Sequence, residues 1–211
     1  MRKKLLKNCR LYLVLDKKAA GTKDLISLAR LAIEGGIDIL QLRWKDKKNR
    51  IVLKVGKELR KVTKEANVLF IIDDNIDLAN TLDADGVHLG QEDLPIKKGR
   101  AILGSEKIIG CSTHTISQAK KAVSEGADYI SVGPIFKTPI KADYKAVGLK
   151  FFKRVRQETE LPVFGIGGIG LNNVKEVIKS GADRVAVVRA IVNATDPKMN
   201  AARLKEELNK T

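Results

Sequence analysis

One pattern occurs four times along the chain and limits the folds that it can adopt. A helical stretch ends at glycine or another small residue, an aspartate follows, and an apolar run of β-forming residues comes next. The four copies span residues 34–40, 82–87, 125–130 and 180–185. Glycine is a frequent helix C-cap, and a continuous apolar run is typical of a buried strand. Each copy therefore predicts the end of a helix and the start of a buried strand.

Four further apolar runs lie between these copies, at residues 11–15, 68–72, 107–111 and 162–166. The segments between the eight runs carry apolar residues at helical spacing. Strands that alternate with helices and are apolar throughout indicate a parallel sheet covered on its faces. Eight such units in 211 residues predict an α/β fold, a compact (β/α)₈ TIM barrel that forms one domain over residues 1–211. A doubly wound sheet is the alternative.

The composition bounds the partners and the location. The chain has 40 Lys and Arg against 25 Asp and Glu, a formal charge of +15, which suits phosphate-bearing ligands, a solvated surface or a nucleic acid. Aromatic residues make up only 4% and no RNA-binding signature is present, so we expect no nucleic-acid partner. No apolar stretch approaches the roughly 20 residues of a membrane span, and the basic N-terminus lacks a signal-peptide core. We expect a cytoplasmic protein with no membrane partner, in which Cys9 and Cys111 are plain buried thiols.

Functional side chains of a TIM barrel follow the carboxyl ends of its strands. Residues 165–170 begin at the end of the seventh predicted strand and continue into the turn after it, and they match G-x-G-x-x-G, the dinucleotide-binding pattern. Only 41 of the 211 residues follow Gly170, too few for the rest of a dinucleotide-binding sheet. In a barrel, this glycine-rich turn suits a phosphate cradle built from backbone N–H groups. A tight turn without a ligand is the alternative.

Two aspartates follow neighbouring strands and suggest a metal site. Asp74 follows the third predicted strand and Asp93 follows the fourth. Two carboxylates on adjacent loops can hold Mg²⁺, which fills its remaining positions with water and phosphate oxygens. The alternative is that Asp74 and Asp93 cap the helices that follow them.

Cationic residues lie on neighbouring loops. Arg43 and Lys45 alternate at the exit of the second strand, so both point to the same side and suit a diphosphate, or else form a solvated charge pair. Lys141, in the loop after the sixth strand, could close over the same group. His88 and His114 have no nucleophile arrangement around them, so we expect hydrogen-bonded supporting residues rather than proton-transfer groups.

Six ordered motifs carry a resemblance to a known family, at residues 41–45, 86–93, 110–115, 126–129, 133–136 and 165–170. Over nearly its whole length, the chain resembles the thiamine-phosphate synthase family. The resemblance implies condensation of hydroxymethylpyrimidine diphosphate with hydroxyethylthiazole phosphate, giving thiamine phosphate and pyrophosphate. It also implies a dissociative mechanism in which the bond to pyrophosphate breaks before the thiazole nitrogen attacks.

The resemblance assigns residues to each part of the site. It implies Mg²⁺ on Asp74 and Asp93. Catalytic roles would belong to Arg43, Lys45, Ser112 and Lys141. Substrate would contact Gln41, Leu42, Arg43, Trp44, Lys45, Asp73, Ser112, Thr138, Pro139, Ile140, Lys141, Gly168, Val188 and Arg189. Of these, Gln41, Arg43, Lys45, Ser112 and Lys141 would bind the pyrimidine diphosphate, and Thr138, Gly168 and Val188 would line the thiazole phosphate pocket.

Three positions depart from the family pattern. Asp73 stands where many members have Asn, Ile140 replaces a hydroxyl residue, and Arg189 stands where many members have Ser. Some relatives are thiazole tautomerases, but the combination of Lys45, Asp74 and Asp93 argues against that role here. Another phosphate-binding barrel enzyme and a basic RNA-binding barrel are the remaining alternatives. The sequence leaves the oligomeric state open, with a homo-oligomer as one option.

Overall fold

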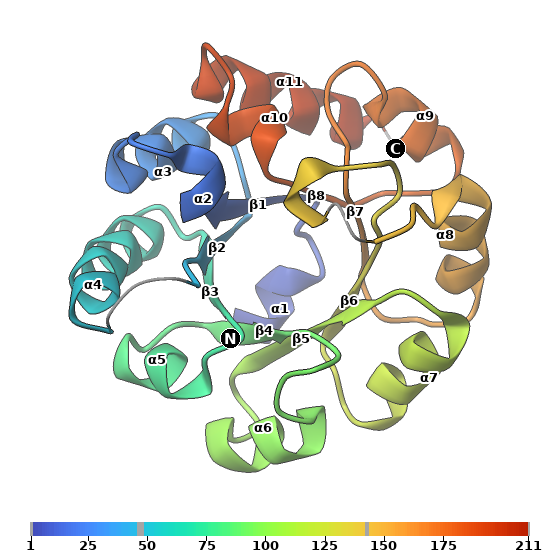
Figure 1. Cartoon of the computed structure of the whole chain (residues 1–211), viewed down its shortest axis with the longest axis horizontal. Helices are drawn as coiled ribbons and strands as arrows, with labels where there is room; N and C mark the ends of the chain where they lie inside the picture. The colour runs from blue at the N-terminus through green and yellow to red at the C-terminus, as the bar shows by residue number, and fades with distance from the viewer. Residues whose placement is uncertain (1, 46–48, 142–143, 211) are drawn as a thin grey trace.

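The computed structural model describes residues 2–45, 49–141 and 144–210. Eight parallel strands pair in sequence order, and the last pairs with the first, so the sheet closes into a barrel (Figure 1). The strands are β1 (Leu11–Asp16), β2 (Ile39–Arg43), β3 (Leu69–Asp73), β4 (Gly86–Leu89), β5 (Ile108–Thr113), β6 (Tyr129–Val132), β7 (Val163–Ile166) and β8 (Val185–Val187). The predicted (β/α)₈ barrel is confirmed, and the doubly wound alternative is wrong.

Helices surround the barrel as an outer ring (Figure 1). They are α2 (Lys17–Ala20), α3 (Leu25–Glu34), α4 (Asn49–Glu65), α5 (Ile76–Thr81), α6 (Ile96–Leu103), α7 (Ile116–Ser124), α8 (Gly148–Gln157), α9 (Val174–Lys179), α10 (Arg189–Val192) and α11 (Pro197–Asn209). A short helix α1 (Arg2–Leu6) lies behind the barrel in this view, and a 3₁₀ turn η1 (Pro139–Lys141) follows β6. No helix within the described ranges is long and apolar enough to span a membrane.

Side-chain alternation along the strands separates two apolar cores. On β1, Leu11, Leu13 and Leu15 pack outward with the helices, whereas Tyr12 and Val14 belong to the inner core. The same alternation holds in the other strands, because successive side chains point to opposite faces. The inner core is small and contains Leu6, Cys9, Tyr12, Val14, Ile39, Leu69, Ile71, Ile108, Tyr129, Phe164 and Ala186. It fills the amino-terminal half of the barrel and leaves the carboxyl-terminal half for polar side chains.

Both cysteines are buried free thiols, as expected. Burial raises the pKa of Cys9 to about 12 and that of Cys111 to about 11. Thiols with such high pKa values are protonated at neutral pH and are therefore poor nucleophiles.

The repeated aspartates fasten the amino-terminal ends of the strands. Asp38, Asp85 and Asp128 each accept a backbone N–H bond of 2.8–2.9 Å from the preceding strand or the residue before it. Each also pairs with basic side chains: Lys205 with Asp38, Arg2 and Arg60 with Asp85, and Lys3 and Arg100 with Asp128. The aspartate therefore ties two adjacent strands to a helix or to the N-terminal segment.

The fourth copy of the repeat behaves differently. Asp183 lies two residues before β8 instead of one, and it pairs with its neighbour Arg184. Its second oxygen, Oδ1, is buried and has no hydrogen-bond partner within the described part of the chain. All four copies of the sequence pattern therefore mark the start of a strand, but in only three of them does the aspartate bond the backbone of the preceding strand or the residue before it.

Asp85 is the most buried of these ties, and two arginines share it. Its carboxylate is 3.1 Å from both Arg2 and Arg60, and its side chain is 2% exposed. Asp85→Asn should lower the free energy of unfolding by up to about 3 kcal/mol, because it removes the buried counter-charge of two partly buried guanidinium groups. Urea unfolding measures this loss.

Asp83→Asn is the matched control. Asp83 also pairs with Arg60, at 3.5 Å, but its side chain is 74% exposed, so the loss should stay below about 1 kcal/mol. Equal losses in the two variants would contradict the proposed role of Asp85.

Candidate active site

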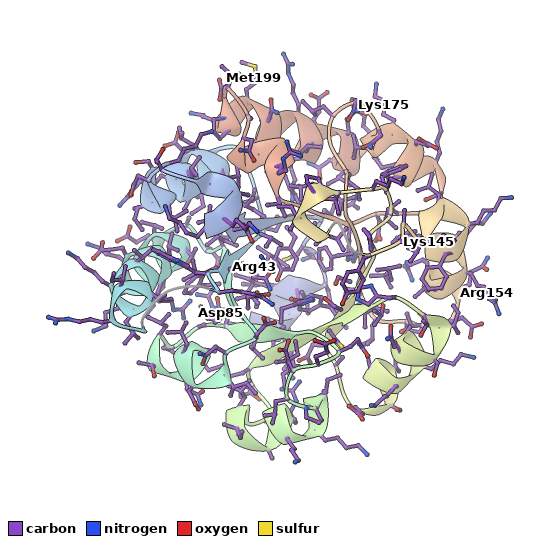
Figure 2. The ribbon with its side chains drawn as sticks, viewed as in Figure 1. Arg43, Asp85, Lys145, Arg154, Lys175 and Met199 are labelled. Carbon is purple, nitrogen blue, oxygen red and sulfur yellow. The ribbon has the colours of Figure 1, made fainter. Side chains whose placement is uncertain are left out.

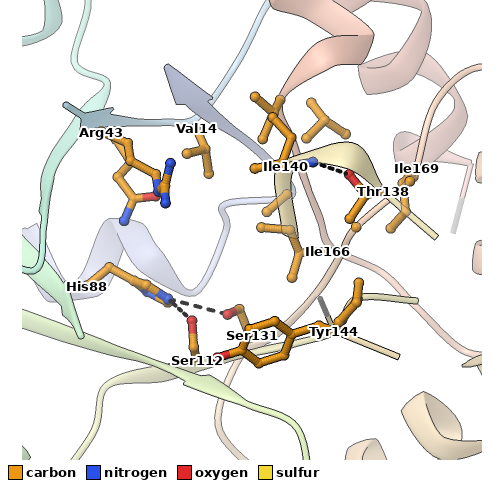
Figure 3. Close-up of a pocket in the computed structure, with 18 of the residues that line it drawn as sticks. Val14, Arg43, His88, Ser112, Ser131, Thr138, Ile140, Tyr144, Ile166 and Ile169 are labelled. Carbon is orange, nitrogen blue, oxygen red and sulfur yellow. Dashed lines mark hydrogen bonds between the residues drawn. The ribbon is translucent and has the colours of Figure 1, made fainter. Parts of the chain in front are cut away.

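A cavity of about 680 Å³ opens at the carboxyl ends of the strands. It is lined by inward-facing strand residues, among them Val14 from the inner core and the polar residues His88, Ser112 and Ser131 (Figure 3). Gln41 lines it as well. Alternation and barrel closure therefore bring together polar residues that are far apart in the sequence. Long cationic side chains such as Arg154 and Lys175 project from the outer helices, whereas Arg43 lies near the barrel axis (Figure 2).

Arg43 lies between two carboxylates at one side of the cavity. It pairs with Asp16, which is 2% exposed, and its Nε is 3.2 Å from Asp73 Oδ2. Asp73 also accepts a 3.2 Å hydrogen bond from Gln41. The Arg43–Asp73 contact is an ion pair without hydrogen-bond alignment, since Asp73 Oδ2 has no such partner among the described residues. Burial, followed by the charge of Asp74, raises the pKa of Asp73 to about 7.

Asp74 and Asp93 meet beside this group. Asp74 adopts a left-handed backbone conformation, φ 59°, which Asp tolerates better than most residues. Its carboxylate is 3.0 Å from Lys45 Nζ, and the hydrogen bond raises the pKa of Lys45. Burial and a hydrogen bond with Asp74 raise the pKa of Asp93. Two carboxyl groups that share a hydrogen bond repel each other when both are ionised, so this position favours a cation.

The balance of charge in this cluster tests whether a metal ion fits. Four carboxylates (Asp16, Asp73, Asp74 and Asp93) face two cations (Arg43 and Lys45), a formal charge of −2 with every carboxyl ionised. Within the described residues, no three His, Cys, Asp or Glu side chains form a metal cage by themselves. Asp74 and Asp93 could still hold Mg²⁺, which binds one or two protein carboxylates and leaves positions for water and phosphate oxygens. The donor set and its charge fit that ion.

The helix-cap alternative for the two aspartates is wrong. The N-cap of α5 is Asn75, which accepts a hydrogen bond from Leu78, and the N-cap of α6 is Pro95. Asp93 instead accepts a 2.6 Å bond from the backbone N–H of Gly90.

The glycine-rich turn after β7 lies across the cavity from the carboxylates. Gly167 and Gly168 have φ values of 99° and 68°, and a Cβ on Gly168 would lie 2.8 Å from the Cβ of Phe136. Asn173 holds the turn through bonds of 2.9 Å to Gly168 and Gly170. Within the described residues, the N–H groups of Gly168 and Ile169 donate to no protein acceptor, so they are available to an anion.

The loop after β6 borders the same side of the cavity. Thr138, Pro139 and Ile140 line it, and the backbone N–H of Ile140 reaches the Thr138 hydroxyl at 3.4 Å (Figure 3). The ring of Tyr144 lies 4.9 Å from that of His114. The side chain of Lys141 lies outside the described part of the structure.

The structure places most of the expected site residues in this cavity, with two corrections. Gln41, Arg43, Lys45, Asp73, Asp74, Asp93, Ser112, Thr138, Pro139, Ile140, Gly168, Val188 and Arg189 line it. Leu42 and Trp44 do not, because they alternate with Gln41, Arg43 and Lys45 and pack in the outer core. The exposed Arg189 side chain makes no hydrogen bond or ion pair within the described residues.

Ser131 lines the cavity, and the buried Asp16 lies beside it as a partner of Arg43; sequence reasoning missed both. Asp16 ends the first apolar run, and its place at the carboxyl end of the first strand is the signal that could have found it. Ser131 is an inward position of β6, next to the buried Ile130. His88 is a hydrogen-bonded interior residue, and His114 bonds the carbonyl of Gly133.

The fold and this cavity define a TIM barrel with an acidic cluster on one side of its site and a glycine-rich turn on the other. Comparison with known proteins gives the family. The family model described as thiamine monophosphate synthase matches residues 11–191. The chain belongs to this family.

Individual relatives agree. The chain is 42% identical to thiamine-phosphate synthase from Nostoc sp., over 99% of this chain and 58% of the relative. It is 44% identical to thiamine-phosphate synthase from Desulfitobacterium hafniense, over 89% of this chain and 91% of that one. Among solved structures, thiamine phosphate pyrophosphorylase from Pyrococcus furiosus superposes with a TM-score of 0.89 at 35% identity, covering 99% of this chain and 98% of that one. The chain spans just under three fifths of the length of several cyanobacterial relatives that it matches.

The raised pKa of Asp73 generates a prediction about stability and pH. The folded-state pKa of about 7 exceeds the ordinary carboxyl value of 3.8, so the folded protein binds the extra proton between these values. The free energy of unfolding should therefore fall, on the order of 2 to 4 kcal/mol, as pH rises from 4 to 7 in metal-free buffer. Asp73→Asn should reduce this fall, as measured by urea unfolding at several pH values.

The exposed Asp77 on α5 provides the control. Asp77→Asn should keep the pH dependence of the unmodified protein. If Asp73→Asn keeps it too, Asp73 is not the group that causes it.

Proposed function

We propose that this chain is a thiamine-phosphate synthase, which joins hydroxymethylpyrimidine diphosphate to hydroxyethylthiazole phosphate and releases pyrophosphate. The observation that carries the proposal is the pairing of two different anion sites in one cavity. The acidic cluster with Arg43 and Lys45 suits a diphosphate only with a divalent cation, whereas the N–H groups of Gly168 and Ile169 suit a phosphate without one. Two anionic substrates need two such sites. Family membership supports the same reaction.

The diphosphate belongs at the acidic cluster. We assign Mg²⁺ to Asp74 and Asp93, and the pyrimidine diphosphate to Gln41, Arg43, Lys45, Ser112 and Lys141. Lys45 is paired with Asp74 in the free protein, so a cation that engages Asp74 frees the ammonium group for a phosphate oxygen. The thiazole phosphate belongs at the turn after β7, with Thr138, Gly168 and Val188 around it.

The reaction requires stabilisation of charge on the leaving diphosphate and positioning of the two substrates, and it requires no protein nucleophile. The bond between the pyrimidine methylene and the diphosphate breaks, and the thiazole nitrogen attacks the resulting cation. Mg²⁺, when bound, neutralises charge on the leaving diphosphate. Arg43 and Lys45 donate to its oxygens, and the glycine turn holds the thiazole phosphate so that the ring nitrogen faces the methylene carbon. No group within this set has to move a proton at the reacting carbon.

One assay tests the proposal. The protein is incubated with both precursors and Mg²⁺, and thiamine phosphate and pyrophosphate are quantified. Equimolar formation of both products is the expected result. Rearrangement of the thiazole phosphate without condensation would instead indicate a tautomerase, and salt-dependent RNA binding without turnover would indicate a binding protein.

The metal assignment predicts a loss that can be measured without turnover. Mg²⁺ should raise the melting temperature of the protein, because it binds the folded carboxylate pair and relieves its repulsion. Asp93→Asn should weaken Mg²⁺ binding, because it removes one of the two proposed carboxylate ligands; it should also remove most of this rise and abolish turnover. Glu92→Gln removes the neighbouring exposed charge and should keep the rise. An Asp93→Asn protein that keeps it would rule out the metal assignment.

Ile140 and Arg189 generate a linked prediction at the thiazole phosphate. Ile140 supplies no hydroxyl donor, whereas the Arg189 guanidinium lines the cavity without a protein partner among the described residues. A charge-assisted contact contributes about 1.5 to 3 kcal/mol, more than a neutral hydroxyl. Arg189→Ser should therefore raise the KM for thiazole phosphate roughly tenfold, and adding Ile140→Thr should restore part of it. An unchanged KM in Arg189→Ser would show that Arg189 is not a ligand.

A further inference from the structure

A chain of buried hydrogen bonds runs from the inner core to the cavity. The hydroxyls of Tyr12 and Tyr129 are 2.9 Å apart, and Tyr129 Oη is 2.9 Å from His88 Nδ1. His88 Nε2 is in turn 3.0 Å from Ser112 Oγ and 3.3 Å from Ser131 Oγ (Figure 3). Tyr12, Tyr129 and His88 are each at most 8% exposed. The chain therefore connects the interior of the barrel to the hydroxyl assigned to the diphosphate.

The number of protons available fixes which group donates in each of these hydrogen bonds. Each tyrosine hydroxyl has one proton to donate. Within the described residues, the Tyr12 hydroxyl has Tyr129 as its only hydrogen-bond partner. If Tyr129 donated to Tyr12, the Tyr12 proton would be buried without an acceptor, which costs free energy. Tyr12 therefore donates to Tyr129, and Tyr129 donates to His88 Nδ1.

This direction fixes the state of the imidazole. A ring nitrogen that accepts a hydrogen bond carries no proton, so neutral His88 has its proton on Nε2. That proton is directed to Ser112 Oγ, with Ser131 Oγ at a longer distance. Ser112 Oγ accepts from His88, and its own hydroxyl proton is then free to be donated to a ligand in the cavity. With the opposite tautomer, the Ser112 proton would be used on Nε2 instead.

We propose that Tyr129 and His88 are positioning residues that turn the Ser112 hydroxyl proton toward the diphosphate subsite. The inference rests on the proposed function, since it needs an anion at Ser112. Packing around Tyr129 holds the geometry. The ring lies 5.5 Å from that of His88 in a stacked arrangement, and an added Cβ on Gly110 would lie 2.0 Å from Tyr129 Cζ. Glycine at position 110 leaves the space that this ring occupies.

The first measurement is the protonation state of His88. The chain contains only two histidines, so NMR of isotope-labelled histidine, assigned with His114→Gln, resolves the ring nitrogens of His88. The expected result in the unmodified protein is a proton on Nε2 and none on Nδ1. Tyr129→Phe removes the donor to Nδ1 and should shift the ring toward the opposite tautomer. Tyr12→Phe should keep the original tautomer, because among the described residues Tyr129 then has only His88 to donate to.

The second measurement is the affinity for inorganic pyrophosphate in the presence of Mg²⁺, by calorimetry. Ser112→Ala and Tyr129→Phe should each weaken binding roughly tenfold, as expected for the loss of one charge-assisted hydrogen bond. The double variant should bind about as weakly as either single one, because both changes remove the same bond. Tyr12→Phe removes a hydroxyl from the same aromatic cluster and should change the affinity by less than about twofold.

The outcomes separate this inference from the proposed function. A protonated Nδ1 in the unmodified protein, or equal pyrophosphate losses in Tyr12→Phe and Tyr129→Phe, would overturn the positioning role. If the unmodified protein has the Nε2 proton but Tyr129→Phe leaves the pyrophosphate affinity unchanged, the link from Tyr129 to Ser112 is wrong. If Ser112→Ala leaves the pyrophosphate affinity unchanged, Ser112 does not bind the diphosphate, whatever the product assay shows. If Tyr129→Phe does not fold, the tautomer of His88 in the unmodified protein still shows whether Tyr129 donates to His88 Nδ1.

Discussion

Closure of the sheet is the constraint on which the rest of the structure depends. In a closed barrel every second side chain points into one enclosed space, so residues distant in sequence share one interior. Here that space divides along the barrel axis. Aromatic and aliphatic side chains such as Tyr12, Phe164 and Ile71 fill the amino-terminal half of the barrel. Inward positions farther along the strands reach the cavity. The core and the site are consecutive layers of one alternation, which explains how a hydrogen-bonded chain can connect them.

A chain with an excess of positive charge holds an acidic cluster at its centre. The basic side chains that lie close to these carboxylates, Arg43 and Lys45, are paired with them. Under the proposed function, the net positive charge would attract anionic substrates, but a diphosphate could approach the carboxylates only if a cation offset their charge. Metal binding and diphosphate binding would then be interdependent. The glycine turn, which relies on backbone N–H groups, has no such requirement.

Much of the fold was predictable, because apolar runs, helix ends and strand exits are local signals. The apolar runs at residues 11–15 and 68–72 predict β1 and β3 from a few residues each, and the position of the glycine turn after the seventh run predicts its place at the site. The helix-cap alternative for Asp74 could not be dismissed from sequence, because Asn75 is an equally good cap and only the backbone conformation separates them. The family motif at residues 41–45 includes Leu42 and Trp44 because a motif does not distinguish the two faces of a strand, whereas both side chains pack in the outer core. The link from Tyr129 to His88 joins residues 41 positions apart, and no local pattern reveals it.

The pairing of β8 with β1 also has a consequence for biosynthesis. Leu13 on β1 lies beside Val187 on β8, so a chain leaving the ribosome makes its first strand long before that strand's second partner exists. Throughout that interval β1 has an open edge with unpaired N–H and C=O groups, a template for pairing with other chains. Premature termination before residue 185 would make this state permanent. We therefore expect such truncated chains to aggregate or to be retained by chaperones.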